Sequence, residues 1–427
     1  MSTSDTPRET LAIDGGPLAC PDSWPARRLF DEEEKRAAMA LFDRALETGE
    51  AFGYSGEEET RYGEAFAAFL GGGYADGVNS GTNAVYVALR ALDLEPFTEV
   101  IVPAITDPGG LMPVPLLNCI PVPADTAPGQ FNAGPEQIAA RLTERTSAIL
   151  VAHISGLPCD MAPIMELARA RGIPVVEDCA QAHGALYRGR MVGSFGDVAA
   201  FSTMNGKHHA SGGQGGLVFT RREDIYWAAR RAADRGKPLG PQSGGAVRAM
   251  PGNVQAALNC NMDELHAAIG RAQLAKLPRI LERRRHTARA LAEGCRRLRT
   301  VRVLEALPGC EGSYWFVFLR LDLARLPVGK TQFVAALQAE GLSPVGASYL
   351  HIPVQQPWYK NRAVFGRSGY PWTCPLYRGN PDAVYDVPNA LATEAGHFRL
   401  MIHEQWGERE VALTLRALEK VERAYAR

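Results

Sequence analysis

The sequence reads Val175-Val-Glu-Asp-Cys-Ala-Gln-Ala-His183 at a point where a short apolar run ends in two carboxylates and a polar turn follows. This pattern predicts a buried strand that carries Asp178 at its carboxyl end. Open α/β sheets bind ligands at that end of their strands, so the position suits a binding residue. A lone Asp before a turn is also a common helix cap, and the surrounding sequence has to distinguish the two roles.

Around this stretch, short Val-, Ile- and Ala-rich runs alternate with helical patterns from Val78 to Thr220. Alternation of this kind predicts an α/β fold with a mainly parallel sheet between helices. The predicted strands cover 99–103, 119–123, 147–153, 173–178, 197–202 and 216–220, and the predicted helices cover 83–94 and 161–171.

The amino-acid composition changes between 236 and 256, where Gly, Pro, Ser and Gln are frequent. We expect a loop there and a domain boundary beside it. The helical stretch 262–299 follows, and we expect it to be kinked or broken at Pro278. Further on, 314–321 is typical of a strand and 408–425 of an amphipathic helix. The expected parts are an N-terminal segment near the small domain, a large domain, and a small α+β domain with the long linking helix, over 1–30, 31–245 and 246–427.

Charge and composition argue against several classes of partner. The 427 residues hold 46 Lys and Arg against 47 Asp and Glu, for a net charge of -1. This balance gives no reason to expect nucleic acid or an anionic membrane as a partner, and we interpret the arginine-rich run 283–299 as a solvated helix face. No apolar run approaches the ~20 residues of a membrane span, and the N-terminus lacks the apolar part of a signal peptide. We therefore expect a cytoplasmic protein whose eight cysteines are reduced.

Lys207 lies in a glycine-rich loop between two predicted strands, Phe201-Ser-Thr-Met-Asn-Gly-Lys-His-His-Ala-Ser-Gly-Gly-Gln-Gly-Gly216. The loop contains no GxxxxGK[ST], which excludes a P-loop. A lysine buried at the end of a sheet has a lowered pKa, and its free amine suits condensation with a carbonyl. Taken alone, the lysine is more readily interpreted as structural. The other motifs of the sequence have to distinguish a structural lysine from a reactive one.

A third feature is Asn79-Ser-Gly-Thr-Asn83, at the start of a predicted helix. Small and hydroxyl residues at a helix N-terminus form an anion site from backbone N–H groups and the helix dipole. A phosphate site, a strand-end carboxylate and a lysine are together what pyridoxal 5'-phosphate requires. One holds the phosphate, one pairs with the pyridine nitrogen and one forms the Schiff base. The sequence therefore predicts a site for this cofactor.

With these motifs the chain resembles the DegT/DnrJ/EryC1/StrS aminotransferases of the fold-type I pyridoxal-phosphate superfamily. The resemblance covers nearly the whole chain and is most specific from 177 to 216. It implies a large domain with a mainly parallel seven-stranded sheet between helices, a smaller C-terminal α+β domain, and a homodimer with the active site at the interface. The supporting motifs are Leu11-Ala-Ile-Asp-Gly-Gly16, His153-Ile-Ser-Gly-Leu-Pro-Cys-Asp-Met161, Asn261-Met-Asp-Glu-Leu-His-Ala-Ala-Ile-Gly270 and His351-Ile-Pro-Val-Gln-Gln-Pro357.

The resemblance also implies roles for individual residues. Lys207 would hold the cofactor as a Schiff base and then move the reacting proton, and Asp178 would keep the pyridine nitrogen protonated. Asn259 would reach the phosphate in the neighbouring subunit. The other implied cofactor ligands are Gln181 near the ring hydroxyl and Gly81, Thr82, Asn83 and Ser202 at the phosphate.

Two positions depart from the family pattern. Asp107 stands where the family usually has an aromatic residue stacked on the cofactor ring, and Asn261 stands where an Arg is common. An Asp before Pro-Gly-Gly is favoured as a turn residue, but its carboxylate also suits the hydroxyls of a substrate, and both interpretations stay open. His183 and His351 are candidate substrate-pocket residues. The spacing of the histidines and cysteines matches no zinc pattern, so we expect no metal.

The resemblance implies a pyridoxal-phosphate-dependent aminotransferase that takes an amino group from L-glutamine or L-glutamate. The acceptor would be a keto-cyclitol or a nucleotide-linked keto-sugar, in aminocyclitol or amino-sugar biosynthesis, often for antibiotics or surface polysaccharides.

The alternatives are a sugar dehydratase or another non-transaminating enzyme of the same family, and a non-catalytic sensor that keeps the fold. Lys207 argues against dehydration, since dehydrating members typically carry His there, and the Lys207–Asp178 pair argues against a sensor. An NAD-linked dehydrogenase is disfavoured because no GxGxxG follows a first strand.

Overall fold

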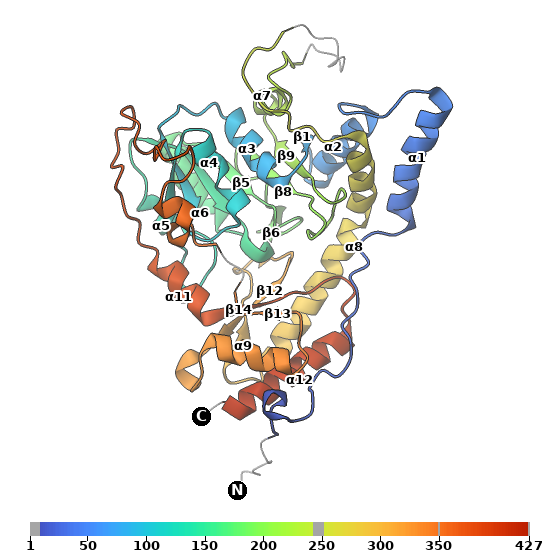
Figure 1. Ribbon diagram of the computed structural model, residues 1–427, viewed down its shortest axis with the longest axis vertical. Coiled ribbons are helices and arrows are strands. Elements are labelled where there is room, and N and C mark those ends of the chain that lie inside the picture. Colours follow the sequence, from blue (N-terminus) through green and yellow to red (C-terminus); the bar gives the residue numbers. More distant parts are fainter. Residues whose placement is uncertain (1–8, 242–251, 349–350, 426–427) are drawn as a thin grey trace.

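The computed structural model describes residues 9–241, 252–348 and 351–425. A seven-stranded sheet with flanking helices forms the larger body of the described chain, and a four-stranded sheet with helices forms the smaller one below it (Figure 1). The long helix α8 (Glu264–Cys295) runs from the larger body to the smaller. Within the described ranges, every helix is too short or too polar to span a membrane.

The larger sheet has the mainly parallel arrangement that the sequence predicts. Its order is β1-β9-β8-β5-β4-β2-β3, and β9 pairs antiparallel with both of its neighbours. The other neighbouring strands pair in parallel, so the carboxyl ends of β5 and β8 lie side by side at one edge. The strands are β1 (Tyr74–Val78), β2 (Glu99–Pro103), β3 (Ile120–Ala124), β4 (Thr146–Ala152), β5 (Val175–Asp178), β8 (Val198–Ser202) and β9 (Gly216–Thr220).

Alternate residues of these strands pack into two separate cores, one on each face of the sheet. In β5, Val175 packs with the core that includes α6 (Met161–Arg171), whereas Val176 packs with the core that includes α3 (Gly81–Ala91). Because both faces are covered, the strands read as continuous apolar runs rather than as alternating ones. The other helices around this sheet are α2 (Glu57–Phe69), α4 (Pro113–Leu116), α5 (Pro135–Ala139) and α7 (Glu223–Ala233).

The smaller body is an antiparallel sheet of order β10-β12-β14-β13. Its core takes in the second half of α8 and also Leu11 and Cys20, so the N-terminal segment packs against it. The elements of this body are β10 (Val301–Val303), β12 (Val317–Leu321), β13 (Val345–Gly346), β14 (His397–Leu400), α9 (Lys330–Ala339) and α12 (Glu408–Tyr425). The remaining α-helices and strands are α1 (Glu32–Thr48), α10 (Pro357–Lys360), α11 (Pro388–Gly396), β6 (Leu186–Tyr187), β7 (Arg190–Met191) and β11 (Cys310–Glu311).

Helix α8 corrects one expectation from the sequence. It is continuous from Glu264 to Cys295 with Pro278 inside it, so of the two expected outcomes, a kink or a break, the break is wrong. Proline removes one backbone donor, but Leu277 and Leu281 beside it are buried against the larger body. Packing of this apolar face stabilises the helix across the proline.

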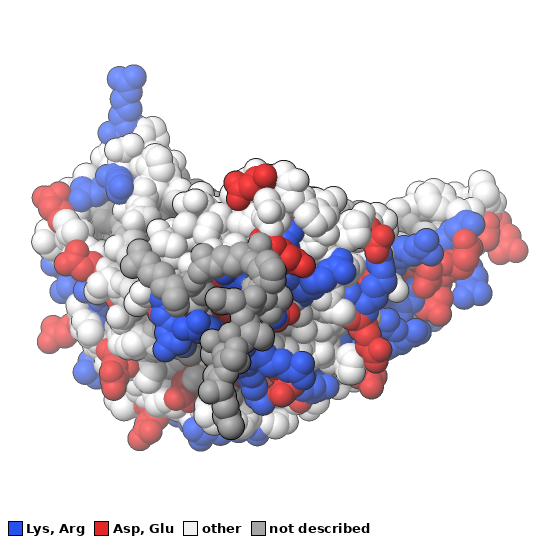
Figure 2. Space-filling view, turned by 90° about the horizontal axis from the view of Figure 1, so that it is seen from below, with Lys and Arg blue, Asp and Glu red and all other residues white. Residues whose placement is uncertain are grey.

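Lysine and arginine side chains are interspersed with aspartate and glutamate over the described residues visible in Figure 2. That face carries no continuous patch of one sign, in keeping with the net charge of -1. Electrostatics on this face therefore gives no support for a polyanionic partner.

A buried carboxylate fastens the N-terminal segment to the smaller body. Glu340 is fully buried, and its two oxygens accept hydrogen bonds from the backbone N–H of Ala12 at 2.8 Å and of Ala19 at 2.9 Å. Lys420 Nζ of α12 donates to Glu340 Oε2 at 2.8 Å and is itself buried. The pair is therefore satisfied as long as both partners are present.

We expect Glu340→Ala to lower the free energy of unfolding by roughly 3–5 kcal/mol, because Lys420 would keep a buried charge without its partner. Denaturant unfolding followed by circular dichroism measures the change. The matched control is Glu293→Ala, which breaks the exposed ion pair with Arg296 (2.6 Å) and should cost under about 1 kcal/mol. Equal effects of the two variants would contradict the assignment of Glu340.

Candidate active site

Asp178 ends β5 at the carboxyl edge of the larger sheet. Its Oδ1 accepts a hydrogen bond from the backbone N–H of Ala180 at 2.9 Å, and its Oδ2 has no hydrogen-bond partner among the described residues. Burial raises the pKa of Asp178, against the opposing effects of the Ala180 N–H and of Lys207. A buried carboxylate with one unused oxygen suits a ligand that brings a protonated nitrogen.

The N-terminus of α3 opens beside Asp178. Ser80 caps the helix by accepting from the backbone N–H of Asn83 at 3.1 Å. Gly81 lies so close to β8 that a Cβ on it would stand 2.5 Å from Ser202 Cβ, which explains why glycine is needed there. Gly81, Thr82 and Ser202 line one pocket of about 200 Å³ together with Asp178 and Lys207. The first turn of the helix therefore presents backbone N–H groups to an anion in this pocket.

Lys207 enters the pocket from the glycine-rich loop between β8 and β9 and is 6% exposed. Burial lowers its pKa to about 8, while Asp178 and Asp107 act in the opposite direction. Its Nζ lies 3.5 Å from the centroid of the Trp315 ring. A lysine with a pKa of about 8 has about a tenth of its amine in the free form at pH 7, far more than an ordinary lysine.

The backbone of Lys207 is held by a largely buried ion-pair network. Arg27 donates to the carbonyl oxygens of Lys207 at 2.6 Å and of His208 at 3.1 Å, and its Nε pairs with Glu404 at 2.9 Å. Arg284 of α8 pairs with the other oxygen of Glu404 at 2.9 Å. Burial alone would raise the pKa of Glu404, but the two guanidinium groups hold it below its ordinary value. The predicted solvated arginine face is therefore wrong for Arg284, which is 1% exposed.

Gln181 and Asp107 complete the pocket. Gln181 Oε1 accepts from the backbone N–H of Ser155 at 2.7 Å. Asp107 is exposed and caps the short turn Pro108–Gly110 by accepting from the N–H of Gly109 at 3.0 Å, and it also lines the pocket. A Cβ on Gly110 would stand 2.7 Å from Asp178 Oδ2, so the turn lies directly against the carboxylate. Both interpretations of Asp107 are compatible with this position.

Four residues named from the sequence lie outside this lining. The backbone N–H of Asn83 is taken by Ser80, and its side-chain amide donates to Asn79 at 2.6 Å. Asn259 is exposed and accepts from Asn261, away from the pocket of its own chain. His351 pairs through its backbone with Thr106, next to the turn that carries Asp107. His183 is fully buried.

His183 packs behind the Lys207 loop with two more buried histidines. Its ring centroid lies 5.5 Å from that of His208 and 5.0 Å from that of His209. Neither ring nitrogen of His183 has a hydrogen-bond partner in the described part of the chain, whereas His209 Nε2 lies 2.7 Å from the hydroxyl of Tyr62. Burial lowers the pKa of His209 to about 3 and holds those of His183 and His208 well below the ordinary value.

His153, Glu177 and Cys179 bring three potential metal-ligand atoms together in the core behind Asp178. Hydrogen bonds already engage two of these side chains. His153 Nδ1 accepts from the N–H of Cys159 at 3.0 Å, so its Nε2 donates to Glu177 at 3.1 Å. Glu177 also accepts from three backbone N–H groups of the turn at 193–196. The cluster therefore fixes the end of β5 by hydrogen bonding.

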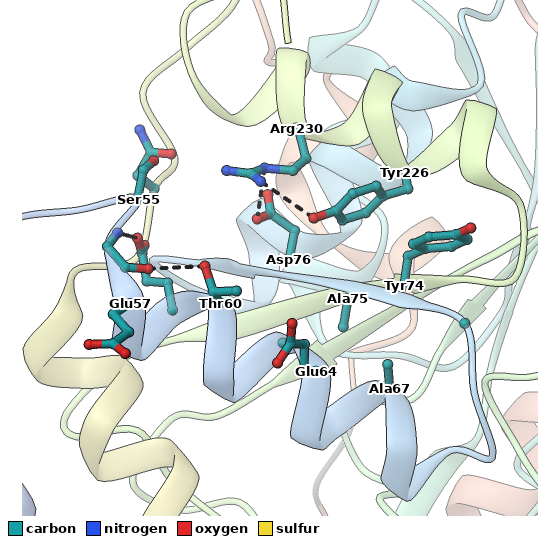
Figure 3. A pocket seen from close by; sticks show the side chains of 15 residues that line it. Ser55, Glu57, Thr60, Glu64, Ala67, Tyr74, Ala75, Asp76, Tyr226 and Arg230 are labelled. Carbon is teal, nitrogen blue, oxygen red and sulfur yellow. Dashed lines mark hydrogen bonds and ion pairs between the residues drawn. The ribbon is translucent and has the colours of Figure 1, made fainter. Parts of the chain in front are cut away.

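A larger pocket of about 590 Å³ lies between α2, β1 and α7 (Figure 3). Asp76 forms an ion pair with Arg230 at 3.3 Å, and Arg230 also donates to the Tyr226 hydroxyl at 3.4 Å. Burial raises the pKa of Glu59 to about 9, so this carboxyl group is mostly protonated at neutral pH. Apart from Asn261, the residues singled out from the sequence do not line this pocket.

The pocket lined by Gly81, Thr82, Asp178, Ser202 and Lys207 (the Lys207 pocket) fits the cofactor that the sequence predicts. It combines an amine with a lowered pKa, a carboxylate with an unused oxygen and the open start of a helix, which match the aldehyde, the ring nitrogen and the phosphate. Fold and site together define a fold-type I pyridoxal-phosphate enzyme.

The chain belongs to the DegT/DnrJ/EryC1/StrS aminotransferase family, whose sequence profile matches residues 32–378. The resemblance seen in the sequence is thereby confirmed.

Individual relatives agree with this assignment. The chain is 30% identical over 377 residues to the L-glutamine:2-deoxy-scyllo-inosose aminotransferase of Micromonospora echinospora, covering 84% of this chain and 88% of that enzyme. It is 33% identical to the 3-amino-5-hydroxybenzoate synthase of Amycolatopsis mediterranei (strain S699), over 60% of this chain and 63% of the relative. A crystal structure of 3-amino-5-hydroxybenzoic acid synthase superposes with a TM-score of 0.78 at 26% identity, covering 93% of this chain and 98% of that one. These similarities confirm the predicted fold class.

The three buried histidines predict how stability depends on pH. Because their pKa values are depressed in the folded chain, an unfolded chain binds protons below about pH 6.5 that the folded chain does not. Their contribution to the free energy of unfolding is therefore fully present above about pH 6.5. It is lost as the pH falls, by about 2 kcal/mol per histidine at pH 5. Denaturant unfolding of the wild type and of His183→Phe at pH 7.5 and pH 5 measures this loss.

We expect His183→Phe to lose about 2 kcal/mol less than the wild type between these pH values. The control is His286→Phe, which alters an exposed histidine of α8 and should leave the pH dependence unchanged. An unchanged pH dependence in His183→Phe would mean that this histidine does not stay neutral in the folded chain.

Proposed function

We propose that this protein is a pyridoxal-phosphate-dependent aminotransferase that moves an amino group from L-glutamine or L-glutamate to a keto-cyclitol or a nucleotide-linked keto-sugar. The observation that carries the proposal is the Lys207 pocket, in which the amine, Asp178 and the start of α3 line one cavity. The support for a polyhydroxylated ketone as the acceptor is the likeness to the 2-deoxy-scyllo-inosose aminotransferase over most of both chains.

When bound, pyridoxal phosphate supplies an aldehyde for amine exchange and a ring that accepts electrons. Lys207 Nζ would carry the reacting proton between the two ends of that exchange, which suits a group with a pKa of about 8. Asp178 Oδ2 would hold a proton at the ring nitrogen and so keep the ring electron-poor. Gly81, Thr82 and Ser202 would hold the phosphate, and Gln181 would contact the ring hydroxyl.

The acceptor would enter past the turn that carries Asp107. This carboxylate is exposed and lines the pocket, so it can accept hydrogen bonds from hydroxyl groups. His351 is tied to the neighbouring Thr106, so its ring is a second candidate for the acceptor side. His183 is buried behind the loop and would act through packing rather than by contact with substrate.

We also propose that the enzyme is a homodimer in which Asn259 reaches the phosphate bound by the other subunit. Asn259 is exposed in a segment that pairs with Asp234 and Val78, outside the lining of its own pocket. Val254 and Leu258 on the same segment are 65% and 55% exposed. A two-fold contact through this segment would cover these apolar side chains.

The proposed activity predicts a two-stage spectroscopic result. Protein loaded with pyridoxal phosphate should lose its visible absorption with L-glutamine or L-glutamate and regain it with a keto-cyclitol or a nucleotide-linked keto-sugar. Lys207→Ala should lower turnover by at least about 1,000-fold, because the amine forms the covalent link and moves the proton. Borohydride reduction should attach the cofactor to Lys207 alone among the seven lysines, as read by peptide mass spectrometry.

Two outcomes of that experiment would contradict the proposal. A product that has lost a hydroxyl group without gaining an amine would indicate a dehydratase. Tight cofactor binding with no response to any donor would indicate a sensor.

Subunit mixing tests the dimer. Lys207→Ala and an Asn259→Ala variant should each be severely impaired alone, whereas their hybrids contain one site with both residues intact. Random mixing makes half of the dimers hybrids with one good site of two, so we expect about a quarter of wild-type activity. Refolding or co-expression followed by a turnover assay measures the recovery. No recovery above the separate variants, or an active monomer at high dilution, would contradict the shared site.

A further inference from the structure

The amine of Lys207 has an unusual partner. Its Nζ lies 3.5 Å from the centroid of the Trp315 ring, and both side chains are buried. Among the described residues this amine forms no hydrogen bond and no ion pair. Asp178 and Asp107 act on it electrostatically, and the neutral ring of His183 lies behind the loop. The amine therefore lies against an aromatic face.

Trp315 is itself fixed in place by the loop that carries Lys207. Its indole N–H donates to the carbonyl of Gly206 at 2.7 Å, one residue before the lysine. Its backbone N–H donates to Ser155 at 3.0 Å, and its carbonyl accepts from Arg284 at 3.0 Å. The ring has little freedom to move away from the amine.

The same ion-pair network holds both partners. Arg27 binds the carbonyl of Lys207, Arg284 binds the carbonyl of Trp315, and Glu404 pairs with both guanidinium groups. The lysine and the indole are thus joined twice, through their side chains and through this network. Such a closed arrangement fixes the distance between the amine and the ring more firmly than either contact alone.

An indole face and a carboxylate hold an amine in different ways. A carboxylate accepts its hydrogen bonds and keeps it protonated, whereas the face of an indole attracts an ammonium more weakly and accepts no strong hydrogen bond. Against an indole the amine keeps its orientation but gives up or takes a proton with little penalty. This combination suits a lysine that must alternate between both states.

We propose that Trp315 is the positioning residue of Lys207. Its indole face receives the amine whenever the lysine is not joined to the cofactor and directs it toward the space beside Asp178. The inference rests on the proposed function only for its role in turnover, since the contact between the amine and the ring exists in the chain itself.

Fluorinated tryptophans test the contact with little change of size. Fluorine withdraws electron density from the ring face, so an ammonium held there is stabilised less with each added fluorine. In the full-length protein without cofactor, the pKa of Lys207 should fall progressively along the series, by about one pH unit overall. Competitive acetylation at several pH values, read by peptide mass spectrometry, measures this pKa.

The control is Trp315→Phe grown with the same fluorinated tryptophans. The chain has six tryptophans, and this variant retains the other five, so its Lys207 pKa should not follow the series. A wild-type pKa that is constant along the series would overturn the proposal. A trend that persists in Trp315→Phe would overturn it too, because another tryptophan would be responsible.

A second readout connects the contact to turnover. With an amino donor deuterated at Cα, Trp315→Leu should slow the donor half-reaction at least about tenfold and increase its isotope effect. The donor concentration for half-saturation should stay the same, and Trp315→Phe should recover most of the rate. Equal rates and isotope effects in the wild type and Trp315→Leu would overturn the role in turnover. If the wild type has no donor half-reaction, the proposed function fails, whereas the acetylation experiment still decides whether Trp315 holds the amine.

Discussion

Glu404 joins the parts of the chain from which the pocket is built. Its carboxylate lies between Arg27 and Arg284, which reach it from the N-terminal segment and from the long helix α8. Buried charges are tolerated only when each has its partners, and here both guanidinium groups also bind backbone carbonyls. Because two of those carbonyls belong to Lys207 and Trp315, the network sets where Lys207 stands relative to the large sheet. A neutral residue in place of Glu404 would leave the buried Arg284 and the half-buried Arg27 without their shared carboxylate.

Inside the pocket, by contrast, the buried ionisable groups are not paired with each other. Burial raises the pKa of Asp178 and lowers that of Lys207, and no ion pair between the two appears among the described residues. Such unrelieved groups lower stability, and proteins keep them where a ligand completes them. A ligand with an aldehyde, a basic ring nitrogen and a phosphate relieves the amine, the carboxylate and the helix start at once. The paired network around the pocket stabilises the fold and offsets the destabilising effect of these unpaired groups.

The sequence predicted what depends on local pattern. The bounds of β2, α6 and α12 agree with their predicted ranges, since apolar periodicity and capping residues act within a few positions. The strand expected from Tyr314 starts at Val317 instead, because Trp315 turns aside to bond Ser155 and Gly206. Arg284 was misread since its partner Glu404 lies 120 positions away, and helical spacing cannot reveal such a contact. Lys207 and Asp178 could be singled out because their residue types follow strand ends, and the structure places both in one pocket, whereas Trp315 had no local feature to mark its contact with Lys207.

The Arg27–Glu404 pair also bears on how the protein is made. The two residues are 377 positions apart in the chain. At roughly 5–20 residues per second, a ribosome needs about 20 to 75 seconds to pass from one to the other. Once residue 220 has been made, the large sheet and the Lys207 loop are complete in sequence, whereas the carboxylate that fixes Arg27 against the loop follows only at residue 404. The contact that fixes Arg27 against the Lys207 loop can therefore form only after nearly the whole chain has been synthesised.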